Sequence, residues 1–136
     1  MRAAQKVGAT ASAAVAAFAL TAGIAHAEGG FDSYASNWVT GKESRHWDDN
    51  NSDGASTTVR FSGCSASNSA FRYAGIQLKR DRSGLPDPVV DRSNNYCNTS
   101  NFGRQSGGTY YFNYSNLNGD DAPRSYLNVS SIAVRY

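Results

Sequence analysis

One stretch, residues 107–114, constrains the fold of this chain more than any other. Two glycines open it, and aromatic residues then occupy every second position, as Tyr110, Phe112 and Tyr114. The side chains of a β-strand alternate between its two faces, so these three rings share one face. We therefore expect a central strand that buries this face in the core, and milder effects of substitutions at Tyr111 on the opposite face.

The other apolar runs are short and also alternate, which is typical of antiparallel strands separated by polar turns. They cover residues 57–64, 71–78, 89–91 and 127–136. The alternation changes phase near Gly75 and near Ser130-Ser131, and each change predicts a β-bulge. Together these patterns predict an all-β fold, namely a single antiparallel β-sandwich that is jelly-roll-like.

The segment 28–40 has a different spacing. Phe31, Tyr34 and Trp38 are three and four residues apart, which fits either one face of a helix or an irregular segment laid over a sheet end. Trp38 and Trp47 are the two tryptophans of the chain. They belong either to the core or to an exposed platform on which a sugar or peptide ligand stacks.

The first 27 residues have the pattern of a secretory signal peptide. Arg2 and Lys6 precede a weakly apolar stretch, which ends in the small-x-small cleavage site Ala25-His26-Ala27. We expect a signal peptide at 1–27 and a secreted, extracellular domain at 28–136. The later sequence has no apolar stretch of membrane-spanning length, so we expect no membrane span.

The formal net charge of +2 comes from the leader. Without Arg2 and Lys6, 11 basic residues balance the 11 acidic residues, all of which follow the cleavage site. Nucleic-acid-binding proteins carry an excess of basic residues, so we expect no nucleic-acid partner.

The chain has two cysteines, Cys64 and Cys97, with no metal-ligand spacing. In an exported protein such a pair predicts a disulfide bond. The bond closes a loop of about 34 residues, and the chain-entropy model assigns it a stabilisation of about 3–4 kcal/mol.

A polar turn near residue 50 matches the opening of a calcium-binding loop, with Asp49, Asn51 and Asp53 followed by glycine. The twelfth position is Arg60 instead of glutamate, which excludes an EF-hand. Two interpretations remain. Either calcium binds a turn closed by a second loop such as Asp120-Asp121, or the side chains bond the local backbone. We expect no cofactor, with calcium as the one candidate ion.

A charged loop with two prolines covers residues 80–88. The prolines exclude central-strand pairing and limit the conformations of the loop. Arg82 and Leu85 are its candidate binding residues. The loop is either an ordinary hairpin connection or the contact loop of a small secreted protease inhibitor, for which a stiff loop is an advantage.

His46 is the one histidine that follows the leader. A Ser-His-Asp arrangement with Asp48 or Asp49 would lack a nucleophile elbow. A ribonuclease-type histidine–glutamate pair would have to use Glu28 or Glu43, and the neutral charge supplies no field for phosphate. We therefore expect a protein that is not an enzyme and has no catalytic residues, with a small secreted hydrolase as an alternative.

Four segments of the second half, AGIQLKRD, PVVDRSNN, GGTYYFNYSNLNG and RSYLNVSS, carry a family resemblance. They resemble the small secreted jelly-roll modules attached to bacterial exoenzymes, the pre-peptidase C-terminal and carbohydrate-binding-like domains. The resemblance implies a small exported bacterial protein with a role in binding or solubility. We thus expect a non-catalytic extracellular binding module whose ligand is a polysaccharide, the cell wall or a secreted protein.

Overall fold

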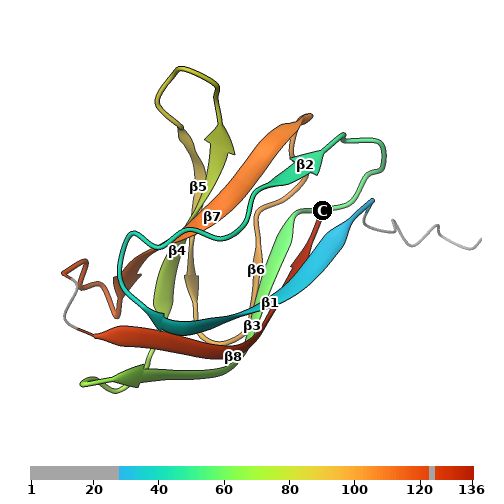
Figure 1. Cartoon of the computed structure of the whole chain (residues 1–136). Coiled ribbons are helices and arrows are strands. Elements are labelled where there is room, and N and C mark those ends of the chain that lie inside the picture. The colour runs from blue at the N-terminus through green and yellow to red at the C-terminus, as the bar shows by residue number, and fades with distance from the viewer. Residues whose placement is uncertain (1–27, 123–124) are drawn as a thin grey trace, which may run out of the picture.

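The computed structural model describes residues 28–122 and 125–136, and the predicted signal peptide lies outside the described residues. Two antiparallel sheets of four strands pack face to face, and the described part contains no helix, hence none that could cross a membrane (Figure 1). The strands are β1 (Gly30–Trp38), β2 (Trp47–Asp49), β3 (Thr58–Ser67), β4 (Ala74–Asp81), β5 (Val89–Asn95), β6 (Thr99–Asn101), β7 (Gly108–Leu117) and β8 (Tyr126–Arg135).

The strand order is that of a jelly roll. Sheet A has the order β1-β8-β3-β6, and sheet B has the order β2-β7-β4-β5. The first strand therefore pairs with the last, the second with the seventh, the third with the sixth and the fourth with the fifth. This is the winding of an eight-stranded jelly roll, and it confirms the predicted antiparallel sandwich.

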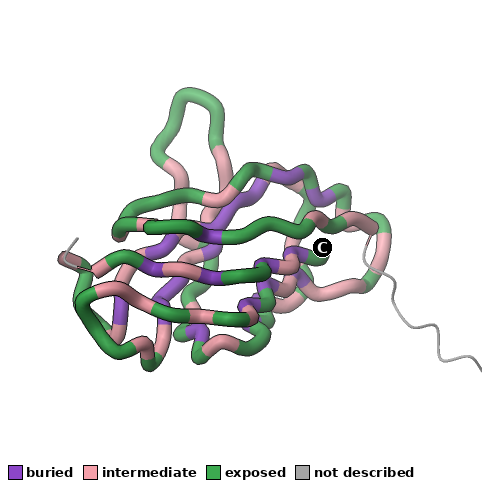
Figure 2. The backbone as a smooth tube through the Cα atoms, turned by 60° about the horizontal axis from the view of Figure 1, so that its bottom comes forward, coloured by how far each residue is buried: buried purple, intermediate pink, exposed green. Residues whose placement is uncertain are grey.

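The core lies between the two sheets, and β7 supplies its centre. Tyr110, Phe112 and Tyr114 are each at most 1% exposed. Phe112 packs against the rings of Phe61 and Trp38, at centroid distances of 6.0 and 6.1 Å. Figure 2 shows that burial is concentrated along the strands, while the loops at their ends are exposed. The buried face predicted from the aromatic alternation is confirmed.

The opposite face of β7 is also covered, which the alternation did not indicate. Tyr111 is only 2% exposed. The chain ahead of β2 runs along the outer edge of β7, where Glu43 bridges Asn113. It brings the His46 ring onto Tyr111, with centroids 4.2 Å apart and planes 6° apart. The expectation that Tyr111 matters less than its neighbours therefore has no basis in its burial.

The N-terminal segment is an edge strand, so both interpretations of its aromatic spacing are wrong. β1 pairs with β8 in sheet A, and the register shifts on either side of Ala35. Phe31 and Trp38 pack against the core, while Tyr34 points to solvent. The spacing of three and four residues therefore reflects bulges in a strand and has no helical cause.

Both predicted phase changes coincide with bulges. The β4–β7 register shifts next to Gly75, where Ser115 is the extra residue on β7 and donates its hydroxyl hydrogen bond to the Gly75 carbonyl at 3.0 Å. The β1–β8 register shifts where β8 contains Ser130 and Ser131.

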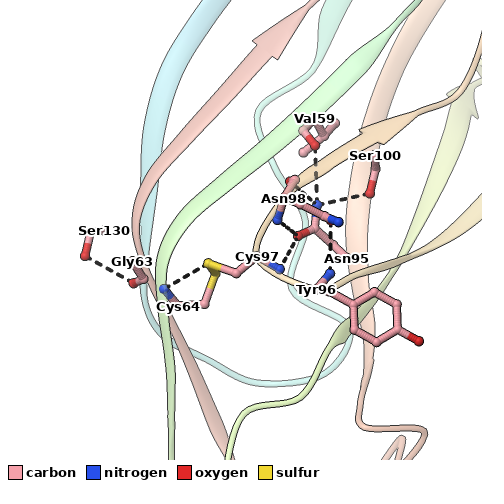
Figure 3. The surroundings of a disulfide bond; sticks show 9 residues. All are labelled: Val59, Gly63, Cys64, Asn95, Tyr96, Cys97, Asn98, Ser100 and Ser130. Carbon is pink, nitrogen blue, oxygen red and sulfur yellow. Dashed lines mark hydrogen bonds between the residues drawn. A yellow bond between two sulfur atoms is a disulfide. The ribbon is translucent and has the colours of Figure 1, made fainter.

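The predicted disulfide between Cys64 and Cys97 is present, with a Cα–Cα distance of 5.8 Å (Figure 3). Cys64 lies in β3 of sheet A, and Cys97 lies in the turn by which the chain passes from β5 in sheet B to β6 in sheet A. The bond thus fastens the crossover between the two sheets to a strand of sheet A.

Candidate functional site

Two predicted binding residues, Arg82 and Leu85, lie in the β4–β5 loop, which projects beyond the sandwich (Figures 1 and 2). Both side chains are exposed, and that of Leu85 is 62% accessible to solvent. The backbone N–H of Leu85 donates to the Arg82 carbonyl at 3.3 Å, and Gly84 has a φ of +73°. The tip is therefore a tight turn that needs glycine at its third position.

Asp87 ties this loop to sheet B. Its Oδ1 accepts a hydrogen bond from the Arg82 N–H at 2.9 Å, and its Oδ2 accepts one from the Tyr111 hydroxyl at 2.6 Å. The Tyr111 hydroxyl lowers the pKa of Asp87, whereas burial, and then the bond to Asp87, raises the pKa of Tyr111. Pro86 and Pro88 fix their own φ angles and confine the residues before them to extended conformations. These bonds and the two prolines restrict the conformations of the loop.

His46 lies at the base of the loop but not in a nucleophilic arrangement. Its Nδ1 is 2.9 Å from Oδ2 of Asp81, and its Nε2 is 3.8 Å from Oε2 of Glu43. The two aspartates suggested as partners are engaged elsewhere. Asp48 accepts a hydrogen bond from Thr109, and Asp49 accepts one from the Asn51 N–H. The His46 ring also stacks on Tyr111 at a centroid distance of 4.2 Å, so His46 joins the end of β4 to the Tyr111 ring.

The two tryptophans do not form a stacking platform. Trp47 is 4% exposed, and its ring lies between those of Phe31 and Tyr136, at centroid distances of 5.9 and 5.8 Å. Trp38 is half-buried against Phe112. Of the two interpretations left open by the sequence, the structure favours the core for Trp47, while Trp38 packs against the core and stays partly exposed. A role of Trp38 in binding stays a prediction.

The candidate calcium loop holds a carboxylate. The backbone N–H groups of Asn50 and Ser52, and the Ser52 hydroxyl, all donate to the side chain of Glu28. Asp49 and Asp53 accept hydrogen bonds from N–H groups two residues further on, which is the local-backbone interpretation of this turn.

The proposed closing loop lies too far away. Asp120 pairs with Leu117 at the end of β7, whereas Asp49 pairs with Gly108 at its start. The ten residues of β7 separate the two places by roughly 30 Å. Asp120-Asp121 therefore does not complete a site with Asp49, Asn51 and Asp53. Whether that turn binds calcium by itself stays a prediction.

We expect the Asp49→Asn variant to be more stable than the wild type at pH 7. This advantage should shrink at pH 4. Burial raises the pKa of Asp49 above its ordinary value of 3.8, with the Glu28 charge adding to the effect. A raised folded-state pKa means that stability is lost as the pH rises through it, because the folded state then binds more protons than the unfolded state. Asparagine keeps the acceptor for Asn51 and removes this cost. Urea unfolding of both proteins at pH 4 and pH 7 measures the difference.

Bound calcium would reverse this result, because the ion would stabilise the wild type more than the variant. If Ca²⁺ is bound through Asp49, about 10 mM calcium should raise the melting temperature of the wild type by several degrees, since millimolar affinity is worth about 1.4 kcal/mol at ten-fold excess. The rise should shrink in Asp49→Asn. Equal melting curves in EDTA and in calcium would leave only the hydrogen-bonded turn.

A second exposed feature lies on the outer face of sheet A, and the sequence analysis missed it. A shallow hollow of about 270 Å³ has Tyr34 and Ser36 of β1 on one side and Ser65 of β3 on the other. Asn128 and Ser130 of β8 lie between them. We call this feature the Tyr34 hollow. The signal that would have found it is the run of polar outward residues beyond the bulge of β8, such as Ser65 and Asn128. That run can be recognised only after the bulges fix the register.

Comparisons with family models, curated proteins and solved structures give no match.

Proposed function

We propose that this protein is a non-catalytic extracellular binding module that recognises a protein partner through the β4–β5 loop. The observation that carries the proposal is Leu85, a large apolar side chain that is 62% exposed at the tip of a projecting loop braced by hydrogen bonds. The fold gains no core packing from this side chain. A well-ordered exposed anchor is what a partner with a matching apolar pocket requires.

The rigidity of the loop supports a role in binding. Asp87 connects the two limbs through Arg82 and connects the loop to Tyr111 beneath it. The Arg80 N–H closes the base by donating to the Pro88 carbonyl at 3.1 Å. A loop that is ordered before binding loses little conformational entropy when the complex forms, so more of the contact energy appears as affinity.

The shape of the tip indicates the kind of contact. The turn from Arg82 to Leu85 makes a convex knob with one apolar and one cationic side chain, which fits a shallow apolar pocket with an acidic rim. A protease cleft binds an extended peptide, and the tight turn on the Arg82 side does not have that shape. Inhibition of a secreted protease is for this reason only the alternative function. It would use Leu85 and the extended residues that follow it.

We expect Leu85→Asp to weaken capture of the partner by at least about 30-fold, the effect of losing a central anchor worth about 2 kcal/mol. The exported protein is immobilised and incubated with the secreted proteins of its own culture, and bound proteins are quantified by mass spectrometry. Val90→Asp is the matched control, because Val90 is 41% exposed on β5 but lies outside the tip. The proposal would be contradicted if every secreted protein that the wild type captures bound equally well to Leu85→Asp and to Val90→Asp.

The Asp87→Ala variant separates the effect of the loop's conformation from that of its contacts with the partner. It leaves Arg82 and Leu85 in place but removes both bonds that hold them, so binding should weaken less than in Leu85→Asp. If the captured protein is a protease, loss of its peptidase activity in the complex distinguishes inhibition from docking at a remote surface.

A further inference from the structure

The outer face of sheet A is divided into a charged half and an uncharged half. Near the start of β1 it carries Arg60, Asp32 and Arg135, and the last two form an ion pair at 2.9 Å. Beyond the bulge of β8, the outward residues bear only hydroxyl, amide or aromatic groups. Among the described residues these are Tyr34, Ser36, Ser62, Ser65, Tyr126, Asn128, Ser130 and Ser131. The Tyr34 hollow lies in this uncharged half.

The hollow offers polar groups that the protein does not use. Oδ1 of Asn128 accepts a hydrogen bond from the Asn37 N–H at 2.9 Å, which turns the amide nitrogen of Asn128 toward other partners. Neither that nitrogen nor the hydroxyls of Ser36 and Ser65 donate to another described residue. These groups can donate and accept without the desolvation cost of a charge.

The backbone around the hollow is fixed. Gly63 has a φ of +65°, and a Cβ atom at this position would lie 2.4 Å from Oγ of Ser130, so glycine permits the close approach of Ser130 to the backbone here. The Ser130 hydroxyl donates to the Gly63 carbonyl at 3.1 Å (Figure 3). Asn37, with a φ of 52°, is held by Asn128. The hollow therefore exists before any ligand arrives.

Two exposed tyrosine side chains lie along this half of the sheet. Tyr34 is 67% exposed and Tyr126 is 42% exposed. Tyr34 lies opposite the part of β8 that contains Ser130, four residues along the strand from Tyr126, which corresponds to a separation of roughly 13 Å. Aromatic rings with a polar tip are suited to surfaces that are apolar on one side and wet on the other.

We infer that the Tyr34 hollow binds an uncharged polysaccharide, with Tyr34 and Tyr126 contacting sugar rings at two points along one chain. Sugar rings present apolar C–H faces to aromatic rings and hydroxyls to serine and asparagine side chains. The absence of ionisable groups other than tyrosine from this half of the face, among the described residues, gives no attraction for phosphate or uronate groups. The hollow is open and shallow, which suits a chain that runs across the sheet.

The experiment measures binding of the exported protein by isothermal titration to soluble uncharged glucan, xylan, mannan and chitin oligosaccharides of increasing length, with polygalacturonate as the anionic control. One uncharged series should bind, more tightly with length. Tyr34→Ala should lower affinity about ten-fold or more at every length. Tyr126→Ala should lower it about 3–10-fold for long oligosaccharides and leave the shortest binders unchanged.

Tyr96→Ala is the matched control, because Tyr96 is 57% exposed in the β5–β6 turn, away from the hollow. All three tyrosines are exposed, so melting temperatures should stay near that of the wild type, and they are measured alongside. No binding to any uncharged series, preference for polygalacturonate, or affinity unchanged by Tyr34→Ala would overturn the inference. Leu85→Asp should not alter sugar binding, so failure of this site and failure of the β4–β5 loop are distinguishable.

Discussion

Phe112→Ala should lower the free energy of unfolding by about 3–5 kcal/mol, because it removes a fully buried ring from the middle of the sandwich. Phe112 is 1% exposed and contacts one aromatic ring from each of two strands of the facing sheet, Phe61 of β3 and Trp38 of β1. The cost combines the lost transfer free energy with a cavity that two rigid sheets cannot close. Urea unfolding followed by tryptophan fluorescence measures it, with Trp38 as a reporter beside the site.

The informative comparison is with Tyr111→Ala, one position along on the other face. Tyr111 is as buried as Phe112, so its loss should also be costly, and the two effects should differ in kind. Tyr111→Ala should additionally release Asp87 and the β4–β5 loop, which limited proteolysis of the loop detects. Tyr111→Phe removes only the hydroxyl and should free the loop at a smaller cost of about 1–3 kcal/mol. A negligible effect of Phe112→Ala would contradict the assignment of the core face.

The antiparallel sandwich and the core face were predictable from the sequence because they follow from local alternation. The strand pairing was not, because β1 pairs with β8 and β2 with β7, segments that lie far apart in the chain. The two-residue spacing alone predicts a buried face for Tyr110, Phe112 and Tyr114, and turn residues mark the ends of the neighbouring strands. The burial of Tyr111 was not readable. It depends on a segment more than sixty residues earlier, around His46, that folds along the edge of β7.

The candidate sites divide in the same way. The β4–β5 loop was predictable because prolines and charges mark it. The bond from Tyr111 of β7 to Asp87 was not, because it joins the loop to a strand 24 residues further along the chain. The Tyr34 hollow depends on register shifts around Ala35, which hide the strand pattern of β1. The sequence left two places open for the tryptophans, because residue type alone does not say which face of an irregular strand is buried.

Removing the disulfide should be the other large loss, about 3–4 kcal/mol out of a total of about 5–15 kcal/mol for a domain of this size. The double variant Cys64→Ala/Cys97→Ala avoids leaving a free thiol. The loss should arise mainly in the unfolded state, because the crossover turn has its own anchor. The side chain of Asn95 is fully buried, accepts from the N–H groups of Cys97 and Asn98, and donates to the Asn98 carbonyl and to Ser100 (Figure 3).

The Asn95→Ala variant tests whether Asn95 anchors the folded turn independently of the disulfide. It should be destabilising with the disulfide intact, because it removes the acceptor of the part-buried N–H groups of Cys97 and Asn98 and leaves a cavity where a fully buried side chain stood. In the double cysteine variant its added cost should be similar or larger, since the turn then depends on Asn95 alone.

Reductant should lower the stability of the wild type to that of the double cysteine variant and leave the variant unchanged. If reductant destabilised both proteins equally, or neither, the bond between Cys64 and Cys97 would not be the link that holds the crossover between the sheets.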